Sequence, residues 1–548
     1  MPKYIFIAGG VMSGVGKGIT SASMGKILQS RGLNVTSLKI DPYVNVDAGT
    51  MNPTEHGEVF VLDDGAECDQ DMGNYERFLN RTLSAENYMT TGSIYQKVIN
   101  RERNLEYNGH CVEVVPHIPM EVIAQINRAT KKDKADIVII EIGGTVGEYQ
   151  NILFLEAVRM LKLQRPRDVL LALVSFLPLQ SGGELKTKPT QYAARTINSA
   201  GLQPDIIIAR AALPLDEKRK EKIAMNCNVK KDDVISAPDV ANIYEVPLIF
   251  EKQNLSNVIL KKLNLKSRGG SINAWRRFVE NSNKSKRAVK IAIVGKYFST
   301  GSFILADSYI SVIEAIKHAA FALHKKPEIT WLSAEDFDPT SPRFRGARTK
   351  KYLKRLKDFD GVIVPGGFGG RGVEGKIAAI KYLRENKIPF LGLCYGMQLA
   401  VVEYARHKAK LAGANTTEVN PKTSHPVIMI LPGQKENLLK KNYGGTMRLG
   451  AYQAILKAGT IARRAYGKTT ISERHRHRYE VNPDYSEQLI KSGLVISGTS
   501  PDGTLAEIVE LPQTKHPFFL AAQFHPEFTS RPLSPNPLFL KFIKSAVK

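Results

Sequence analysis

The chain has 548 residues, of which 43% are hydrophobic and 24% charged, a balance that indicates a globular protein and excludes a disordered or fibrous one. At about 150 residues per domain, the length predicts two to four domains. Lys and Arg number 77 against 53 Asp and Glu, and the formal charge of +24 would suit nucleic acid, an anionic membrane or polyphosphate substrates. Nucleic acid is disfavoured, because the basic residues are spread along the chain without an aromatic RNA-binding pattern or zinc-finger spacing.

The sequence gives no signal for a membrane or for an oxidising compartment. It has no run of 18 apolar residues, and Met1–Gly10 leads into a predicted strand without the zones of a signal peptide. Its four cysteines show neither disulfide nor zinc-site spacing. We therefore expect a cytoplasmic protein with reduced thiols and no membrane partner.

The first half of the chain alternates short apolar runs with helical stretches. The runs cover residues 4–8, 34–40, 136–141, 169–174 and 205–209. Near-continuous apolar strands separated by helices indicate a parallel sheet covered on both faces. Residues 1–266 are therefore predicted to form one doubly wound α/β domain.

A basic segment separates this domain from a second α/β pattern. Residues 261–290 carry ten Lys or Arg against one acid, together with Gly and Asn/Ser breakers, so residues 267–288 are predicted to be a solvated interdomain linker. Apolar runs then recur, and residues 289–548 are predicted to form a second doubly wound, mainly parallel-sheet domain. Within it, residues 296–306 and 434–450 are expected to be longer loops of the kind that often lie over sites.

A glycine-rich stretch, Gly9–Gly18, follows the first strand and enters a helix. Its backbone N–H groups, the helix N-terminus and Lys17 would bind phosphates. Gly18 stands where the standard loop has Ser or Thr, and the glycine spacing is one residue long, so metal ligands must come from elsewhere. Asp71 and Glu141, the latter at the tip of a parallel strand, are the candidates, although either could be an ordinary cap or turn acid.

Two lysine-bearing segments would extend a phosphate site. Lys39 ends a predicted strand, and residues 182–191 form a loop rich in Lys, Thr and Gln that would suit a triphosphate and a polar base edge. Lysines on a loop are also commonly only solvated, and the spacing alone does not decide between these two interpretations.

The second half contains the pattern of a nucleophile elbow. Cys394 has a glycine two places to either side, after an apolar run and before a helical stretch. Downstream, His525 and Glu527 supply a base and an orienting carboxylate in the chain order of a catalytic triad. A lone buried cysteine is the alternative, but the glycine flanks and the His-Pro-Glu sequence favour catalysis.

Two further segments allow more than one interpretation. Residues 367–372 satisfy the dinucleotide pattern G-x-G-x-x-G, but the preceding Pro-Gly turn favours a loop that presents N–H groups to an oxyanion. The cluster 473–480 could bind a metal, form a basic surface, or hold a substrate carboxylate through its arginines.

From end to end these residues resemble one family, the glutamine-hydrolysing CTP synthases. The segments that carry the resemblance are Asp41–Asp47, His56–Phe60, Glu141–Gly147, Lys186–Gln191, Gly444–Gly450, Glu473–Glu480 and Gln523–Thr529. The glutaminase segments alone would be shared with many amidotransferases, whereas the Lys186–Gln191 loop and the Glu141 segment would not.

The resemblance implies a ligase whose first domain uses Mg-ATP to phosphorylate O4 of UTP, while its second domain releases ammonia from glutamine. Ammonia then displaces the phosphate to give CTP, ADP and phosphate, the last step of de novo pyrimidine nucleotide synthesis. By this resemblance, the ATP-binding residues are Ser13, Gly14, Val15, Gly16, Lys17, Gly18, Ile19, Lys39 and Asp71, and the magnesium ligands are Asp71 and Glu141. The UTP- or CTP-binding residues are Ser13, Glu148, Lys186, Thr187, Lys188, Pro189, Thr190, Gln191 and Lys222.

For the glutaminase, the resemblance implies a thioester on Cys394, with His525 moving the proton and Glu527 orienting it. The glutamine-binding and oxyanion positions are Gly367, Tyr395, Gln398, Glu418 and Arg478, and GTP would act as an allosteric activator near Phe368, Arg371 and Arg448. The resemblance also implies an ammonia passage near His56 and Val59 and a homotetramer that could assemble into filaments.

Some residues depart from the family pattern, and two other classes of protein are disfavoured by the residues present. Gly14 and Val15 should alter packing in the phosphate loop, and the sequence Glu148–Gln150 puts the strength of CTP feedback in question. A cobyric acid synthase type of amidoligase would not need the triphosphate cradle of residues 186–191. A non-catalytic ATPase scaffold that polymerises or binds nucleic acid would not need the set Cys394, His525 and Glu527.

Overall fold

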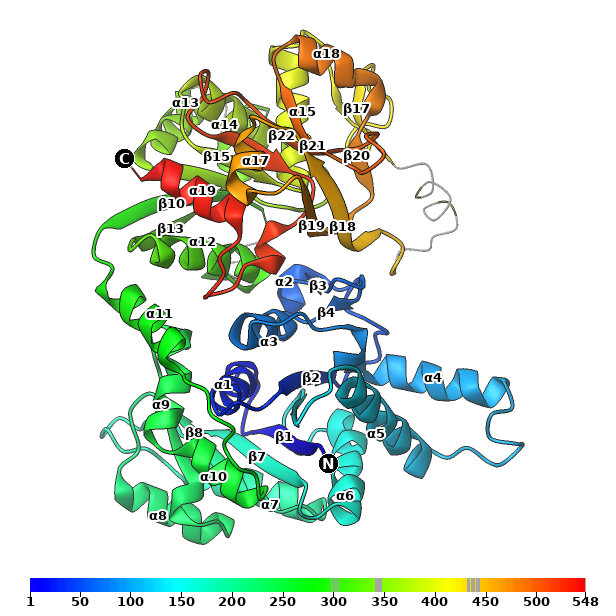
Figure 1. The fold of residues 1–548 in the computed structure, drawn as a ribbon, viewed down its shortest axis with the longest axis vertical. Helices are drawn as coiled ribbons and strands as arrows, with labels where there is room; N and C mark the ends of the chain where they lie inside the picture. Colours follow the sequence, from blue (N-terminus) through cyan, green and yellow to red (C-terminus); the bar gives the residue numbers. More distant parts are fainter. Residues whose placement is uncertain are drawn as a thin grey trace. The chain divides into compact units, whose positions relative to one another are not determined.

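A parallel sheet lies at the centre of the first half of the chain (Figure 1). The computed structural model describes residues 1–296, 299–300, 303–304, 306–340, 347–430, 434, 439 and 444–547. In the described chain this sheet has seven strands, and all neighbouring pairs run parallel. In spatial order they are β5 (Tyr88–Thr90), β2 (Val35–Asp41), β6 (Ile137–Ile142), β1 (Lys3–Gly10), β7 (Val169–Phe176), β8 (Ile206–Ala211) and β9 (Val234–Pro238).

The strands begin at the centre and wind outward to both edges, which makes the sheet doubly wound. Helices α5, α6 and α7 pack on the face of β1 that carries Tyr4 and Phe6, while α1 packs with α3 and α9. The helices of this half are α1 (Lys17–Gln29), α3 (Asp71–Leu79), α4 (Thr91–Arg103), α5 (Val114–Lys132), α6 (Ile152–Gln164), α7 (Lys188–Ser199), α8 (Glu217–Cys227), α9 (Val246–Lys252) and α10 (Leu255–Lys262). The order of the strands reverses at β1, and ligands of open α/β sheets bind at such a reversal.

The second sheet combines a parallel part with an antiparallel extension. In spatial order its described strands are β13 (Lys326–Ser333), β10 (Ala288–Gly295), β14 (Gly361–Val364), β15 (Phe390–Leu393), β23 (Phe519–Ala522), β22 (Ala506–Glu510), β21 (Val495–Thr499), β18 (Arg448–Leu456) and β19 (Thr470–His477). From β13 to β23 the pairs are parallel, and from β23 to β19 they are antiparallel. The predicted α/β fold with mainly parallel sheets is confirmed, and the antiparallel extension was not predicted.

Helices cover both faces of this second sheet. One core contains side chains of α14 and α15, and the other contains side chains of α12 and α19. The helices are α12 (Ile310–Ala322), α13 (Ala347–Lys354), α14 (Val373–Glu385), α15 (Tyr395–His407), α17 (Ile461–Tyr466), α18 (Ser486–Lys491) and α19 (Pro537–Ala546). Small sheets are formed by β11 (Ser299–Thr300) with β12 (Phe303–Ile304), and by β16 (Asn415–Thr416), β17 (Pro426–Ile430) and β20 (Tyr479–Val481). The expected loops 296–306 and 434–450 are described only in part, and the described parts include β11 and β12 in the first and the start of β18 in the second.

The chain folds into two compact units whose limits differ from the predicted domains. The first unit comprises Met1–Ala48 and Asp71–Val279, and the second comprises Gly49–Gln70 and Glu280–Lys548. Residues 49–70, predicted as part of the first domain, thus pack with the second unit. They contain α2 (Pro53–His56) and the antiparallel pair β3 (Phe60–Val61) and β4 (Glu67–Cys68).

The predicted linker also differs from a solvated connector. It contains α11 (Asn273–Lys284), whose Trp275 is 1% exposed. The Trp275 indole donates a hydrogen bond to the Tyr244 carbonyl at 2.9 Å, and its ring centroid lies 5.0 Å from that of Phe78. The first part of α11 therefore belongs to the core of the first unit.

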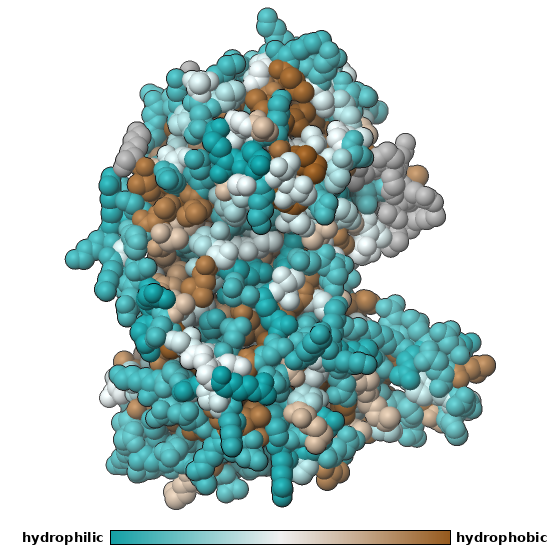
Figure 2. Space-filling model, in the orientation of Figure 1, coloured by the Kyte–Doolittle hydropathy of each residue, from teal (hydrophilic) through white to brown (hydrophobic). Residues whose placement is uncertain are grey.

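The outer surface fits the charge of the chain. Hydrophilic residues predominate on the face of the protein that Figure 2 shows. Among the described helices, none combines the length and apolar character needed to cross a membrane.

Candidate active sites

The predicted phosphate loop connects β1 to α1 at the centre of the first sheet. Gly16, with φ +84°, is the N-cap of α1, and Gly14 and Val11 also have positive φ. A positive φ is costly for a β-branched residue, and such strain is typical of binding loops. The loop thus turns its backbone at the point where an anion would meet the helix N-terminus.

Gly18 explains why this loop lacks the usual Ser or Thr. A Cβ at Gly18 would lie 1.9 Å from Asp71 Oδ1, because the Asp71 carboxylate occupies the space that a side chain would need. Asp71 therefore brings an oxygen ligand to the place where the standard loop has a hydroxyl. This contact agrees with the prediction that metal ligands come from outside the loop.

Lys39 joins the two predicted metal ligands in one buried cluster. Its Nζ lies 2.5 Å from Asp71 Oδ2 and 2.9 Å from Glu141 Oε1. Glu141 also accepts hydrogen bonds from Ser21 and Tyr75. Burial raises the pKa of Glu141, although Lys39 opposes this, whereas the pKa of Asp71 is lowered because Lys39 outweighs the effect of burial.

Lys17 lies beside this cluster and reaches across the loop. Its Nζ donates to the Gly144 carbonyl at 2.7 Å, and burial lowers its pKa while Glu141 opposes the shift. The two carboxylates fit magnesium, which prefers oxygen ligands and is commonly bound by one or two carboxylates together with substrate phosphates. Among the described residues, no group of three or more His, Cys, Asp or Glu side chains is arranged to hold a metal ion.

A pocket beside the phosphate loop was not predicted as a whole. Its wall includes Gly16 and Ile19 from the loop and α1, and it continues over Arg210, Asp239 and Phe250. Arg210 Nη2 pairs with Asp239 Oδ1 at 2.8 Å. Only Ile19 and Gly16 were named from the sequence, because nothing in the local pattern links residues 210 and 239 to the loop.

A second pocket gathers four of the nine predicted UTP residues. Lys186, Thr187, Lys188 and Lys222 line it, as predicted, together with Lys218 and Arg219, which the sequence analysis missed. Glu184 also lines the pocket and pairs with Lys186 at 2.5 Å. The signal for the missed residues was the basic run at 218–222, which by itself is indistinguishable from a solvated helix face.

Other predicted nucleotide residues have different surroundings. Thr190 is fully buried and accepts a hydrogen bond from Ser175, so its hydroxyl fixes α7 to β7. Gln191 donates to Thr187, and Pro189 lies in the first turn of α7. Ser13 is exposed in the loop, and Glu148 is the N-cap residue of a short helical turn.

In the second unit, Cys394 occupies the turn between β15 and α15. Its φ of +50° is strained for a non-glycine residue, as expected for a nucleophile elbow. The flanking glycines are required by packing, since a Cβ at Gly396 would lie 2.0 Å from the Val364 carbonyl and one at Gly392 would lie 2.8 Å from Ala521 Cβ. The predicted turn is therefore what the structure shows.

His525 and Glu527 follow β23, next to the cysteine. His525 Nδ1 donates to Glu527 Oε1 at 2.7 Å, whereas the buried Nε2 has no hydrogen-bond partner among the described residues. Burial would lower the pKa of His525, but Glu527 and Cys394 raise it to about 10. A Cβ at Gly366 would lie 3.0 Å from His525 Cε1 and 3.8 Å from Cys394 Cβ, so both side chains flank this glycine.

The predicted oxyanion loop borders the same pocket. Gly366, Gly367 and Phe368 line it together with Cys394, His525 and Glu527. The loop is held from outside through the carbonyl of Gly369, which accepts hydrogen bonds from the Tyr395 hydroxyl at 2.9 Å and from Lys296 at 3.1 Å. Lys296 was not named from the sequence, since its link to the loop depends on the pairing of β10 with β14.

Of the predicted glutamine-binding residues, Gly367 lines this pocket, whereas Tyr395, Gln398, Glu418 and Arg478 are not among its lining residues. Gln398 donates to the Tyr479 carbonyl, and its buried Oε1 has no partner in the described part of the chain. Glu418 accepts the Gly369 N–H at 2.6 Å, and burial raises its pKa. Arg478 donates to Gln434 and Thr446 at 2.8 and 2.9 Å.

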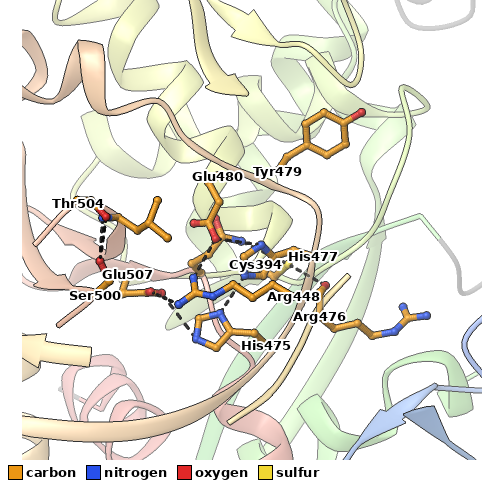
Figure 3. Close-up of polar contacts among 12 residues, drawn as sticks. Cys394, Arg448, His475, Arg476, His477, Tyr479, Glu480, Ser500, Thr504 and Glu507 are labelled. Carbon is orange, nitrogen blue, oxygen red and sulfur yellow. Dashed lines mark hydrogen bonds and ion pairs between the residues drawn. The ribbon is translucent and has the colours of Figure 1, made fainter. Parts of the chain in front are cut away.

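The residues predicted for GTP separate into two environments. Phe368 is 37% exposed with Arg476 over its ring, and Arg371 is exposed and pairs with Glu335. Arg448 is instead buried, and its guanidinium lies 2.9 Å from Glu480 and 2.7 Å from Glu507 (Figure 3). Both arms of Arg448 are thus engaged, so the geometry supports a structural role rather than a contact with a nucleotide.

The side chains around Arg448 include several of residues 473–480 and indicate the role of that segment. Figure 3 shows His475 and His477 beside Arg448, with 2.9 Å between His475 Nδ1 and His477 Nε2. Burial lowers the pKa of each histidine well below its usual value. Burial likewise raises the pKa of Glu480 to about 8 although Arg448 opposes it. These side chains form a buried polar network and not a surface patch.

Together the two sites define a class of protein: a class I type of glutamine amidotransferase joined to an α/β domain with a phosphate-binding loop. Residues 3–265 match the family model described as CTP synthase N-terminus, and residues 304–545 match glutamine amidotransferase class-I. The chain belongs to the CTP synthase family.

Similar proteins support this assignment over the whole length. The chain is 51% identical to the CTP synthase of Sulfurisphaera tokodaii over 550 residues, covering 100% of this chain and 99% of that protein. It is 51% identical to the CTP synthase of Sulfolobus acidocaldarius, with 100% of both chains covered. Among solved structures, the Trypanosoma brucei CTPS glutaminase domain with bound acivicin is 38% identical, with a TM-score of 0.42 over 47% of this chain and 93% of that chain.

Proposed function

We propose that this protein is a glutamine-hydrolysing CTP synthase, a ligase that converts UTP, ATP and ammonia into CTP, ADP and phosphate. The observation that carries the proposal is the presence of two complete reaction centres on one chain. One is the elbow with Cys394, His525 and Glu527, and the other is the phosphate loop with Lys39, Asp71 and Glu141.

In the first unit, the loop and Lys17 would bind the ATP phosphates, with the adenine in the pocket of Arg210 and Asp239. Lys39 is placed to stabilise negative charge on the phosphoryl group as it moves to O4 of the uracil ring. Phosphorylation turns that oxygen into a leaving group, which ammonia displaces at C4. Magnesium held by Asp71 and Glu141 would neutralise charge on the ATP phosphates.

The UTP triphosphate would bind in the pocket that Lys186, Lys188, Lys218, Arg219 and Lys222 line. Five cations around one pocket suit a highly charged anion and not an apolar acceptor. This pocket therefore supports UTP as the acceptor rather than the corrinoid of other amidoligases. It also suggests a binding role for part of the positive charge of the chain.

In the second unit, Cys394 would attack the side-chain amide of glutamine to form a thioester. With its raised pKa, His525 carries a proton at neutral pH and can give it to the departing ammonia. The N–H groups of Gly367 and Tyr395 would stabilise the oxyanion, and Gln398, Glu418 and Arg478 would hold the substrate. A water then releases glutamate from Cys394.

Regulation and assembly are further parts of the proposal. GTP would activate the glutaminase by contacting Phe368 and Arg371, which belong to the oxyanion loop. Arg448 is not among the proposed GTP contacts, because it is buried. We also propose a cytoplasmic homotetramer that could form filaments, with no nucleic-acid or membrane partner.

The test is the absorbance-monitored conversion of UTP to CTP with ATP and magnesium, using either glutamine or ammonium chloride as nitrogen source, with and without GTP. Cys394→Ala should abolish glutamine-dependent synthesis and spare ammonia-dependent synthesis, because the thiol serves only the glutaminase. Asp71→Asn, the matched variant of the other centre, should reduce both. Equal loss of both activities in folded Cys394→Ala would contradict this division, and no product from wild type with either nitrogen source would refute the synthase.

A further inference from the structure

Residues 49–70 form part of the wall of the glutaminase pocket. Pro53, Glu58 and Val59 line the same pocket as Cys394 and His525. These residues come from the N-terminal half of the sequence, but they pack within the second unit. The surroundings of the catalytic histidine are therefore made by several distant parts of the sequence.

An aromatic stack connects this segment to the histidine ring. Phe528 stacks on His525 with 5.0 Å between ring centroids and 15° between planes. Phe60 meets the Phe528 ring edge-on, at 5.0 Å and 61°. Phe60 is fully buried and Phe528 is 2% exposed, so the stack has no room to rotate.

Arg474 makes a second connection between the segment and the histidine. Its carbonyl accepts the His525 backbone N–H at 2.8 Å. Its guanidinium donates to the Val61 carbonyl at 3.0 Å, pairs with Asp63, and lies 5.4 Å from the Phe60 ring centroid. Arg474 is 1% exposed, and these contacts join its side chain to residues of this segment.

The segment itself is anchored firmly on the second unit. Glu58 accepts the Ser311 N–H at 3.1 Å, and the Ala451 N–H donates to the Asp63 carbonyl at 2.9 Å. Arg476 pairs with Glu67 at 2.8 Å, and the Arg476 carbonyl accepts the Cys394 thiol at 3.8 Å. A shift of residues 49–70 would therefore also shift His525 and Cys394.

We propose that Phe60 and Arg474 are positioning residues that hold the His525 ring and backbone in the orientation that glutamine hydrolysis needs. They touch neither substrate nor the reacting atoms and act through Phe528 and the His525 N–H. The inference rests on the proposed function, because it assigns a role to His525 in the glutaminase. It adds that the glutaminase is incomplete without residues 60–63 of the N-terminal half.

The test compares Phe60→Leu with Phe518→Leu in the full chain. Phe518 is also fully buried in the second unit and packs on Phe542, whereas the ring stacked on His525 is that of Phe528, so Phe518 controls for the lost ring volume. Release of glutamate from glutamine is measured directly over a range of pH, and CTP synthesis is measured with ammonium chloride.

Phe60→Leu should lower kcat for glutamate release about 10-fold, since small misplacements of a catalytic group are costly, and leave KM nearly unchanged. The basic limb of its pH profile should move to lower pH, because a looser ring loses part of the contact with Glu527 and Cys394 that raises the His525 pKa. Ammonia-dependent synthesis should not change, and Phe518→Leu should behave as wild type in both respects.

Asp63→Asn provides a second variant in case Phe60→Leu does not fold. Asp63 is half-exposed, so the change removes a partner of Arg474 without opening a cavity, and it should lower kcat about 3-fold with the same shift of the pH profile. An unchanged kcat and pH profile in the folded variants, or equal loss with glutamine and ammonia, would overturn the inference. Because glutamate is measured directly, failure of wild type to make CTP would refute only the proposed synthase.

Discussion

Tyr395, the residue after the nucleophile, lies between two lysine side chains. The Nζ of Lys296 is 5.3 Å and that of Lys376 is 5.4 Å from the centroid of the Tyr395 ring. Lys376 is fully buried, and its Nζ has no hydrogen-bond partner among the described residues. Among the described residues no hydrogen bond compensates for the burial of this ammonium group beside the aromatic face, so it is costly to bury in its charged form.

Lys376→Met should therefore stabilise the protein, most of all at low pH. Burial, with a contribution from Lys296, lowers the pKa of Lys376 to about 7. Between pH 7 and 10.5 Lys376 is protonated in the unfolded chain but not in the folded chain. The free energy of unfolding therefore rises with pH over this range. Below pH 7 the folded chain carries the buried charge, which is where Lys376 destabilises the protein most. We expect the midpoint of thermal unfolding to rise by about 4 °C at pH 6 and by less at pH 9.

The control for this change is Lys381→Met on the same helix, where the side chain is only partly buried and little effect is expected. Equal stabilisation by Lys376→Met at both pH values would show that the change acts through packing and not through the charge.

Gly18 allows a test of the first reaction centre at the same scale. Gly18→Ser restores the usual residue of a phosphate loop, yet its Cβ would lie 1.9 Å from Asp71 Oδ1. We expect synthesis from both glutamine and ammonia to fall by about 100-fold or more, because Asp71 must move away from Lys39. Glutamate release measured without UTP and ATP should be retained, and synthesis at the wild-type rate would contradict the role given to Asp71.

At the residue scale, sequence reasoning was most successful where one short segment indicates both a reactive side chain and the backbone geometry that it needs. The glycines around Cys394 and the sequence His525-Pro-Glu527 carry both, and the structure brings them to one pocket. Lys296, Lys376 and Arg219 carry no local pattern, because their roles depend on residues 19 or more positions away. A single sequence therefore cannot distinguish them from solvated lysines and arginines.

At the scale of elements, strand β19 organises the glutaminase through alternate residues. The carbonyls of Arg474 and Arg476 contact the His525 N–H and the Cys394 thiol, while the Glu473 side chain accepts hydrogen bonds from Thr529 and Asn536. The spacing of two between Arg474 and Arg476 follows from the alternation of a β-strand. The pattern Glu473–Glu480 was recognised, but its function as a scaffold strand was not predictable without its neighbours in the sheet.

Arg448 links three strands of this part of the protein, and its removal should be strongly destabilising. It extends from β18 to Glu480 on β20 and Glu507 on β22, so Arg448→Met would leave two buried carboxylates without a cation. We expect a loss of about 3 to 5 kcal/mol in the free energy of unfolding at pH 8.

The loss should be smaller at pH 5, and denaturant unfolding at the two pH values measures the difference. Burial raises the pKa of Glu480 to about 8, above its value in the unfolded chain, so the folded state binds the extra proton at low pH and loses it as pH rises. Without Arg448 the ionised form becomes still less favourable. A loss that does not depend on pH, or loss of GTP activation with unchanged stability, would argue against the structural role.

For the whole molecule, the period of the apolar runs was sufficient to predict two α/β units. The antiparallel extension β22-β21-β18-β19 was missed, because β18 and β21 are only partly buried and resemble loops in a single sequence. The membership of residues 49–70 was missed for another reason. Their strands are two residues long, and their partners, such as Arg474 and Phe528, are more than 400 positions away.

The exchange of this segment means that the chain passes between its two units three times, at residues 48–49, 70–71 and 279–280. A gene cut at the apparent domain boundary would therefore not give two self-sufficient proteins. The C-terminal fragment would lack part of its own catalytic wall, and the N-terminal fragment would expose Phe60, Val61 and Leu62, which are buried in the second unit. A transplant of the glutaminase into another protein would therefore have to carry residues 49–70 along with residues 280–548.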